Sequence, residues 1–492
     1  MHTKIGFIMQ HNECATGYNN RTMIQNNECI AAIDIGTTKI VAMVGRKHPT
    51  GKVEVMAVSK TESRGVRRGM VLNVEETARD IEKVMLDVQQ KTGLTFKEVF
   101  VGIAAQHIRC LKSRSYFDRD DSEMLISEED VLRLHREVSR IAIDPREQIV
   151  CVIPQHFIVD GEADIRNPVG MTGKRIEANF NIVLCQKTSA ANIDRCMQRL
   201  NLSVARLFLE PLASADAVLT DEEREAGVAM LDIGGGTTDI AVFLEGELKH
   251  AAVIPFGGFV VTKDIKEGCG ILQKQAESLK IKYGSSFGSL ADEDKIILIN
   301  GIGGRDQKEV TVKTLANIIQ ARMEEIIDAA MFEISNSAFA DRLHAGIVLT
   351  GGGSLLRDLP QLVRYQTGMD VKVASPCNYV SDKCGQELEH PMFATGIGLL
   401  IQGFHFLEEH SKHDSAQVLG YAKPSVQTMV TSSLQPEPSV TAASSVVSPT
   451  IEGEASESGS KRKDGPLGRT FKNWQNYLTA IFDEENNDKF KE

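Results

Sequence analysis

Two distant stretches of the chain share one pattern of apolar and polar positions. In IAAIDIGTTKIVAMV, residues 30–44, two apolar runs are separated by a short turn of small and polar residues. The same pattern returns in VAMLDIGGGTTDIAVF, residues 228–243. Apolar runs on either side of a turn that contains glycine and threonine predict a β-hairpin in each place.

The two predicted hairpins also match residue by residue. Asp34 and Asp232 each follow an apolar strand and precede glycine and two threonines. Only a short motif is repeated. It is shorter than the repeating unit of a solenoid protein, which has about 20 to 50 residues. Two such copies far apart in the chain predict two similar α/β halves that face one another. The alternative is coincidence, because any hairpin can use glycine and threonine at its turn.

Helical periodicity marks much of the remaining chain. Ile81, Val84, Met85 and Val88 recur at helical spacing within residues 75–92. The same reasoning predicts helices over residues 127–140, 187–200, 262–283, 313–336 and 391–407, with a buried strand from Gly346 to Leu349. Residues 423–460 are dominated by Ser, Thr, Pro, Val and Glu without any periodicity, which predicts a disordered linker.

Composition and charge exclude several classes of protein. A chain of 492 residues with 42% hydrophobic and 25% charged residues is typical of globular domains. The net charge of −12 disfavours a nucleic-acid partner, which would require a basic face. Nine cysteines without a CxxC pair favour reduced thiols over a disulfide framework. No run reaches the roughly 18 to 20 apolar residues of a membrane-spanning helix.

A third glycine-rich segment suggests a nucleotide site of a particular kind. No Walker A motif is present, since the nearest approach, Gly45 to Val53, has one residue too many. TGGGSLLRDLP, residues 350–360, instead follows an apolar strand and leads into a short helix. Three glycines allow a ligand close to the backbone, with N–H groups near a helix N-terminus available to an anion. Taken alone, each glycine cluster is explained equally well by a tight turn.

Five segments in this order resemble the actin-like ATPase superfamily. They are IDIGTTK (33–39), EPLASADAVL (210–219), LDIGGGTTDI (231–240), VLTGGGSLL (348–356) and MFATGIGLL (392–400). The resemblance implies a two-lobed actin-like α/β fold in which two hairpins hold the phosphates of ATP. It also implies that Asp34 and Asp232 hold Mg²⁺ through water molecules, since Mg²⁺ dehydrates reluctantly.

The resemblance assigns individual residues to this expected ATP site. They are Asp34, Gly36, Thr37, Thr38 and Lys39 at the first phosphate loop, Asp232, Gly234, Gly235, Gly236, Thr237 and Thr238 at the second, Gly351, Gly352, Gly353 and Leu356 at the nucleoside, and Glu277 and Lys280 at ribose and adenine. Glu210 matches the acid that orients a water molecule or the metal in relatives. Two structural alternatives stay open. Glu210 can instead be an acid at a helix N-terminus, and Glu277 and Lys280 can instead form an exposed ion pair.

Within this superfamily the sequence resembles the FtsA family of bacterial cell-division proteins. VIPQHFIVDGEADIRNPVGMTGKRIEANFNIVLC, residues 152–185, resembles the subdomain 1C that is specific to that family, and VGIAAQHIRC and RGMVLNVEETARDI match the segments leading into it. The implied divisions are a disordered extension (1–27), subdomain 1A (28–102 and 186–227), subdomain 1C (103–185), subdomain 2A (228–261 and 341–410), subdomain 2B (262–340), a disordered linker (411–465) and an amphipathic helix (466–485).

The tail carries an apolar stripe of its own. Phe471, Trp474, Leu478, Ile481 and Phe482 recur at steps of three or four residues. Lys472 does not belong to the apolar stripe, but we expect it to contact the membrane together with these five residues. Basic residues 461–463 and 469 come before the helix, where they oppose its dipole, so an anionic lipid surface explains them better than helix stability does. The alternative is a helix that docks on the protein's own core.

The family resemblance implies a function and two rivals. We expect an ATP-binding, self-associating, peripheral protein on the cytoplasmic face of the inner membrane at the division site, with at most slow ATP hydrolysis. The resemblance implies that subdomain 2B binds the C-terminal peptide of FtsZ and that subdomain 1C binds other division proteins. The rivals are an MreB- or PilM-like scaffold and a sugar-kinase-like phosphotransferase, which would need a base for its acceptor hydroxyl.

Overall fold

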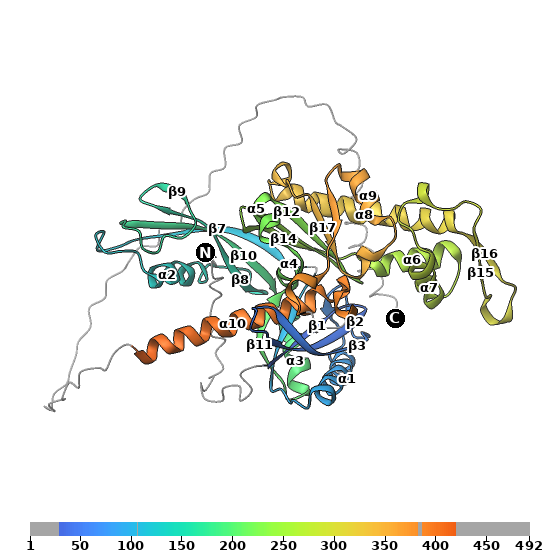
Figure 1. Cartoon of the computed structure of the whole chain (residues 1–492), viewed down its shortest axis with the longest axis horizontal. Coiled ribbons are helices and arrows are strands. Elements are labelled where there is room, and N and C mark those ends of the chain that lie inside the picture. The colour runs from blue at the N-terminus through green and yellow to red at the C-terminus, as the bar shows by residue number, and fades with distance from the viewer. Residues whose placement is uncertain (1–28, 106, 382–385, 420–492) are drawn as a thin grey trace, which may run out of the picture. The chain divides into compact units, whose positions relative to one another are not determined.

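Two five-stranded sheets with the same strand pattern form the centre of the fold (Figure 1). The computed structural model describes residues 29–419 apart from residue 106 and residues 382–385. The first sheet has the order β3 (Val53–Glu62), β2 (Lys39–Lys47), β1 (Cys29–Ile35), β6 (Glu98–Ile103) and β11 (Ser203–Leu209). The second has the order β14 (Glu247–Ile254), β13 (Thr238–Leu244), β12 (Val228–Ile233), β17 (Ile347–Thr350) and β18 (Val371–Val373).

The two sheets confirm the predicted duplication of α/β halves. In each sheet three consecutive strands pair antiparallel, and two further strands then join in parallel. Both predicted hairpins are present, as β1–β2 and β12–β13. Every residue of β12 and β13 is buried, which explains why these strands read as continuous apolar runs.

Helices on the first sheet agree closely with the predicted spans. The helix α1 (Val74–Thr92) begins at Asn73, whose side chain accepts hydrogen bonds from the N–H groups of Glu75 and Glu76. It ends at Gly93, which adopts the left-handed conformation common after helices. The helix α3 (Lys187–Arg199) also agrees with its predicted span, 187–200, whereas α4 (Glu210–Val218) and the short α5 (Asp221–Ala226) lie outside every predicted helix.

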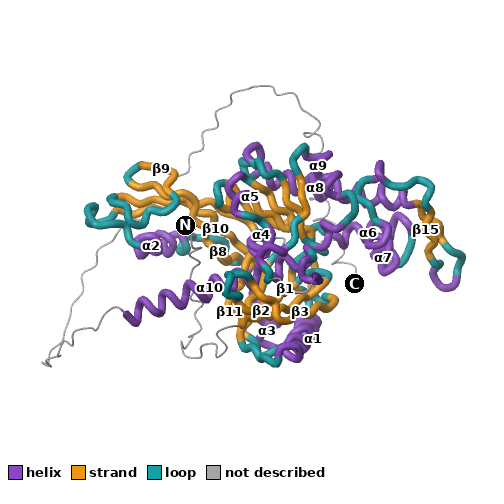
Figure 2. The backbone as a smooth tube through the Cα atoms, viewed as in Figure 1, coloured by secondary structure: helices purple, strands orange, loops and turns teal. Residues whose placement is uncertain are grey.

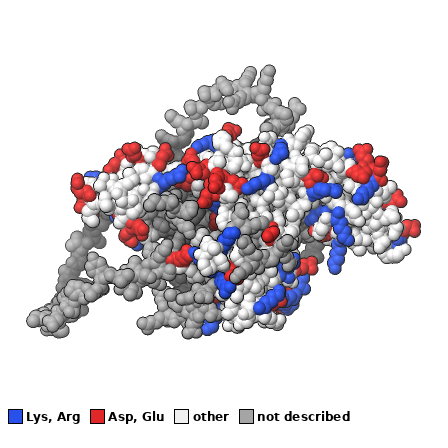
Figure 3. Space-filling view, viewed as in Figure 1, with Lys and Arg blue, Asp and Glu red and all other residues white. Residues whose placement is uncertain are grey.

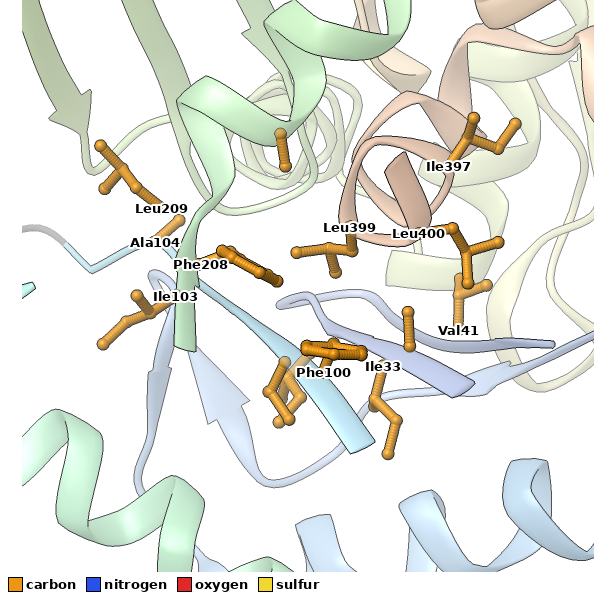
Figure 4. Packing of buried hydrophobic residues seen from close by; sticks show 14 of the residues in the cluster. Ile33, Val41, Phe100, Ile103, Ala104, Phe208, Leu209, Ile397, Leu399 and Leu400 are labelled. Atoms are coloured by element: carbon orange, nitrogen blue, oxygen red, sulfur yellow. The ribbon is translucent and has the colours of Figure 1, made fainter. Parts of the chain in front are cut away.

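The helix α10 (Ala394–Leu419) packs against α4 and the first sheet (Figure 4). A Cβ at Gly398 would overlap the backbone carbonyl of Ala213, so the close approach of α10 to α4 requires glycine there. Leu399 lies beside Phe208 and Phe100, whose rings stack with centroids 5.6 Å apart. The predicted span of 391–407 was too short, because residues 391–393 form a 3-10 turn and α10 continues to Leu419.

The helical segment predicted over 262–283 is two helices, and this part of the prediction was wrong. The helix α6 (Gly258–Cys269) ends at Gly270, which has a φ of 59°, and α7 (Gln273–Tyr283) begins three residues later. Glycine in the left-handed conformation is a common helix stop. The same part of the chain contains a ribbon of β15 (Ile296–Ile299) and β16 (Lys308–Thr311), the helix α8 (Val312–Asn336) and the helix α9 (Leu359–Thr367).

The segment between β6 and α3 forms a separate sheet with its own core (Figure 2). Its strands have the order β7 (Arg109–Asp118), β10 (Arg175–Gln186), β8 (Glu147–Val159) and β9 (Glu162–Ile165), and the helix α2 (Glu128–Val138) packs against β7 and β10. Ser127 and Asp130 cap this helix reciprocally. Phe180, Leu134 and Ile176 are almost completely buried in this second core.

Side chains of this sheet bond to the backbone of the edge strand β14. The Nδ2 of the buried Asn181 donates to the carbonyl oxygens of Leu248 and Lys249, each at 3.1 Å. The Nε2 of Gln155 donates to the same Leu248 oxygen at 2.9 Å, and the Cys110 thiol donates to the Ala251 oxygen at 3.3 Å. The inserted sheet therefore occupies an edge that would otherwise present unpaired backbone groups.

The described residues show how charge is distributed on one face of the surface and whether any of their helices could span a membrane. Acidic and basic side chains are interspersed on the face drawn in Figure 3. No helix in the described part of the chain has the length and apolar character needed to cross a bilayer. Six cysteines of the described part of the chain are free thiols: Cys29, Cys110, Cys151, Cys185, Cys196 and Cys269. The predicted extension 1–27, most of the linker 411–465 and the helix 466–485 lie outside the described residues.

Candidate functional site

Asp34 and Asp232 are both buried, and their carboxylates interact electrostatically. Asp34 lies in β1 opposite Val41, and Asp232 lies in β12 opposite Asp239, so each stands at the turn end of its hairpin. The Lys39 Nζ lies 3.9 Å from a carboxylate oxygen of Asp34 and also donates to the Met392 carbonyl oxygen. Burial raises the pKa of Asp34, and Lys39 partly offsets this effect.

Two hydroxyl groups orient the Asp232 carboxylate. Ser214, from α4, donates to its Oδ2 at 2.6 Å, and Thr395, from α10, donates to the same atom at 3.1 Å. Burial raises the pKa of Asp232, while these hydrogen bonds and Lys39 act in the opposite direction. Two helices from different parts of the chain thus fix the direction in which Asp232 presents its other oxygen.

Glu210 and Asp239 complete a cluster of four buried carboxyl groups. Glu210 is the first residue of α4, and a Cβ at Gly102 would lie 2.7 Å from its Oε1. Burial raises the pKa of Glu210 well above its usual value, and Asp34, Asp239 and Asp232 raise it further. Burial likewise raises the pKa of Asp239, reinforced by Asp232 and Asp34. Glu210 therefore begins a helix, as one interpretation had it, and it also belongs to the cluster. Its role as the acid that orients a water molecule or the metal stays a prediction.

This carboxylate cluster fits a cation that is held through water. The Asp239 Oδ1 is buried and accepts no hydrogen bond. Four buried acids beside Lys39 carry an excess of negative charge, which a divalent cation would neutralise. No three His, Cys, Asp or Glu side chains in the described ranges are placed to ligate a metal directly. Mg²⁺ usually retains several waters and uses one or two carboxylates, which suits Asp34 and Asp232.

The turns of the two hairpins lie against one another. A Cβ at Gly235 would overlap the Thr38 side chain, and a Cβ at Gly236 would overlap the Thr37 side chain. Glycines at these two positions therefore permit the close approach of the turns. The Thr238 Oγ1 donates to the Phe256 carbonyl oxygen at 2.8 Å. Gly36, Gly234 and Thr237 lie in these same turns, so the structure brings together the residues assigned to both phosphate loops.

The glycine-rich turn after β17 lies against Asp232. Gly351 has a φ of 80°, and a Cβ there would overlap the Asp232 carboxylate. A Cβ at Gly353 would overlap Ile233, whereas Gly352 is exposed and would accept one easily. The turn continues as a four-residue 3-10 helix that ends before Leu356. The residues assigned to the nucleoside therefore adjoin the carboxylate cluster.

Glu277 and Lys280 form an ion pair, which is the alternative that their spacing in the sequence left open. Hydrogen bonds through Gly258 also connect Lys280 to the second hairpin. The charged atoms of the pair lie 2.9 Å apart, and the Lys280 side chain is only 12% exposed. The Lys280 Nζ donates to the Gly258 carbonyl oxygen at 2.9 Å and to the Thr262 hydroxyl at 2.8 Å. The N–H of Gly258 in turn donates to the Gly234 carbonyl oxygen at 2.9 Å. The pair is therefore more than an exposed surface contact.

Several residues of the cluster were missed by sequence reasoning. Asp239 follows the two threonines of the second hairpin at the place where Lys39 follows those of the first. The duplication thus carried a signal for Asp239 that we did not use. Ser214 and Thr395 lie inside the motif segments 210–219 and 392–400, but only the folded chain places their hydroxyls on Asp232.

Replacing Asp239 with asparagine is expected to stabilise the protein in the absence of nucleotide and metal. A carboxyl group whose pKa is raised by folding costs stability as the pH rises from its unfolded-state pKa through its folded-state pKa. We expect a gain of about 1–3 kcal/mol in the free energy of unfolding at neutral pH. The gain should shrink near pH 4. Thermal unfolding in EDTA across this pH range provides the measurement.

The exposed Asp118, at the end of β7, offers a matched control for this substitution. Asp118→Asn makes the same chemical change at the surface and should leave the melting temperature nearly unaltered. Two results would contradict the assignment of Asp239 to the cluster of four buried carboxyl groups. One is a lower melting temperature in Asp239→Asn than in the unmodified chain, and the other is a gain in melting temperature that is the same at every pH.

Comparison with known proteins identifies the family. The profile described as "Cell division protein FtsA" matches residues 229–398, and that described as "SHS2 domain inserted in FTSA" matches residues 105–184. The chain is 35% identical over 397 residues to the cell division protein FtsA of Pseudomonas aeruginosa, covering 81% of this chain and 94% of that relative. It is 30% identical over 400 residues to that of Escherichia coli strain K12, covering 80% and 93%.

A solved structure shows the same fold at low sequence identity. The chain resembles a protein of the "PilM-PilN type IV pilus biogenesis complex" with a TM-score of 0.53 and 16% identity, covering 76% of this chain and 98% of that one. The predicted actin-like fold is thus confirmed, as is the predicted family resemblance. The chain belongs to the FtsA family of cell-division proteins.

Proposed function

We propose that the chain binds ATP together with Mg²⁺ at the ends of its two hairpins. The observation that supports this proposal is the cluster of four buried carboxyl groups beside Lys39, at turns made of glycine and threonine. Bound Mg²⁺ would supply the positive charge that this cluster and the phosphates require. Asp34 and Asp232 would hold the ion through water, and the hairpin N–H and hydroxyl groups would bind the phosphates.

The remaining assigned residues would hold the nucleoside. The backbone of Gly351 to Gly353 would lie beneath the adenosine, with Leu356 next to it, because this turn packs directly against Asp232 and Ile233 of the second hairpin. Glu277 and Lys280 would meet the ribose and adenine. Their connection to Gly258, and from there to the second hairpin, would link nucleoside and phosphate recognition.

Glu210 would orient the water molecule that attacks the terminal phosphate. Burial and the three neighbouring acids raise the pKa of Glu210 well above its usual value. We propose that the site binds ATP and hydrolyses it slowly at most.

At the level of the cell, we propose that the chain is a peripheral membrane protein that connects FtsZ to the cytoplasmic face of the inner membrane at the division site. The relatives it matches are cell division proteins, and its tail sequence carries the apolar stripe around Trp474. Self-association would present many tails to one surface and so strengthen a weak anchor. The inserted sheet β7–β10 would receive other division proteins.

The C-terminal peptide of FtsZ would bind the part of the chain that contains α6, α7, α8 and the β15–β16 ribbon. Several apolar side chains in this region are strongly exposed, among them Ile281 at 73%, Ile296 at 53% and Leu298 at 59%. Exposed apolar groups of this kind suit a peptide ligand. Fluorescence anisotropy with the labelled peptide should show saturable binding to the full chain. A peptide of the same composition in scrambled order is the control, and equal binding of both would favour an MreB- or PilM-like scaffold.

A further inference from the structure

A small hairpin outside the two phosphate hairpins touches both of them. The strands β4 (Val66–Arg67) and β5 (Met70–Val71) are joined by the two-residue turn Arg68–Gly69. The N–H of Gly69 donates to the Thr37 Oγ1 at 3.0 Å, and a Cβ at Gly69 would lie 3.4 Å from the Thr237 Cγ2. The turn therefore lies beside the tips of both phosphate hairpins.

The Gly69 N–H controls what the Thr37 hydroxyl can do. A hydroxyl that accepts a hydrogen bond through its oxygen still has one proton to donate. Gly69 occupies one acceptor site of Thr37 and leaves the hydroxyl proton available to donate, which is the role that a phosphate oxygen requires. The base of the small hairpin is held in place, since Val66 and Val71 are buried and the Asn192 Nδ2 donates to the Val71 carbonyl oxygen at 2.8 Å.

Arg68 occupies a backbone conformation that arginine rarely adopts. Its φ is 49° and that of Gly69 is 73°. Positive φ at both central residues is the pattern of a type I′ turn, where Asn-Gly is usual. Arginine lacks the local hydrogen bonding that makes asparagine tolerable there. A strained residue next to a candidate ligand site points to a functional role for its side chain.

The charges around the turn indicate what that role is. Asp34, Asp232, Asp239 and Glu210 are all buried, and the positive charge that lowers the pKa of Asp34, Asp232 and Glu210 comes from Lys39. A nucleoside triphosphate brings further negative charge to the hairpin tips. A guanidinium group binds phosphate oxygens through several donors at once and keeps its charge at any pH of interest.

We propose that the Arg68–Gly69 turn is a third phosphate-binding element, in which Gly69 orients the Thr37 hydroxyl and Arg68 binds the terminal phosphate of a nucleoside triphosphate. The nucleoside turn at Gly351 adjoins Asp232 near the strand ends, whereas the Arg68–Gly69 turn adjoins Thr37 and Thr237 at the hairpin tips. The phosphate chain would therefore end beside Arg68. The inference rests on the proposed ATP site. It adds that Arg68 makes this site bind a nucleoside triphosphate more tightly than a nucleoside diphosphate.

Three substitutions at one position test this proposal in the full-length chain. Arg68→Gly and Arg68→Asn remove the charge and suit the backbone, whereas Arg68→Lys keeps the charge. Arg67→Gln, at an exposed position one residue earlier, is the matched control. Equilibrium dialysis would measure the affinities for ATP and ADP with Mg²⁺, and a thermal melt of each variant would report its stability.

We expect Arg68→Gly and Arg68→Asn to weaken ATP binding about 10-fold or more and ADP binding less than about threefold, since one charge-assisted contact is lost. Glycine and asparagine fit a positive φ, so the backbone of the turn should tolerate both substitutions, and a cooperative thermal melt of each variant checks that it is folded. Arg68→Lys and Arg67→Gln should lose much less affinity for ATP.

Other outcomes would overturn the inference. An equal loss for ATP and ADP, or unchanged ATP binding, in both uncharged variants would each exclude Arg68 as a ligand of the terminal phosphate. If the unmodified chain binds neither nucleotide, the proposed ATP site fails first and this inference fails with it. Failure of the inference alone would leave wild-type ATP binding intact, so the two cases are distinguishable.

Discussion

Replacing Asp232 with alanine is expected to lower the affinity of the chain for Mg²⁺-ATP at least about 100-fold, a loss of about 2.7 kcal/mol in binding free energy. Ser214 and Thr395 hold one oxygen of this carboxylate and so fix the orientation of the group that we propose holds Mg²⁺ through water. A preoriented carboxylate loses little freedom on binding, which makes its removal costly.

The fold should survive this substitution. Burial raises the pKa of Asp232 more than Ser214, Lys39 and Thr395 lower it, so its charge is a cost to the folded state and not a source of stability. Binding of a fluorescent ATP analogue, titrated with and without Mg²⁺, provides the measurement, and a thermal melt checks folding. Asp118→Ala, at an exposed position, is the control. ATP binding by Asp232→Ala that equals that of the unmodified chain would count decisively against the proposed site.

Removing residues 466–492 is expected to abolish binding to vesicles that contain anionic lipid. Five large apolar side chains, half buried in the bilayer interface, contribute on the order of several kcal/mol before the helix is ordered. Nearby basic residues add about 1 kcal/mol each on an anionic surface. Because ordering the helix offsets part of this free energy, the anchor should be reversible and should weaken at high salt.

A pair of point substitutions separates the apolar stripe from simple charge effects in the tail. Trp474→Glu and Gln475→Glu each add one negative charge to neighbouring positions, but only Trp474 belongs to the stripe. In vesicle co-sedimentation, Trp474→Glu should reduce the bound fraction more than about 10-fold, whereas Gln475→Glu should reduce it slightly. Equal losses in the two variants would indicate that charge alone governs binding and would contradict the stripe.

Much of the fold was predictable because its strands are buried on both faces and repeat. The runs around Asp34 and Asp232 are continuous apolar segments with the same turn chemistry, so their shared hairpin form followed from the sequence. The break between α6 and α7 at Gly270 was not predicted, since an isolated glycine is tolerated in many helices and only its left-handed conformation ends this one.

The candidate site was predictable only in part, for a different reason. The glycines and threonines of the turns stand in recognisable motifs, but the partners of Asp232 come from α4 and α10 and are set by packing. The same holds for the bonds from Asn181 to β14, which join residues 67 and 68 positions apart. Contacts of this kind depend on tertiary structure, and single-sequence periodicity carries no signal for them.

Together these features describe a chain whose parts would serve one task. The hairpins and the Arg68–Gly69 turn would bind ATP, the part around α8 would bind FtsZ, and the tail would bind lipid. The bonds between the inserted sheet and β14 connect that sheet to the strand that pairs with β13 of the second phosphate hairpin.

The central claim is that the chain connects FtsZ to a membrane, and vesicle recruitment tests it most directly. FtsZ should be incubated with vesicles containing anionic lipid, Mg²⁺-ATP and either the full chain or the chain without residues 466–492. We predict that FtsZ sediments with the vesicles only when the full chain is present, and that FtsZ lacking its C-terminal peptide does not. FtsZ that sediments equally with the full chain, with the shortened chain and with vesicles alone would contradict the account.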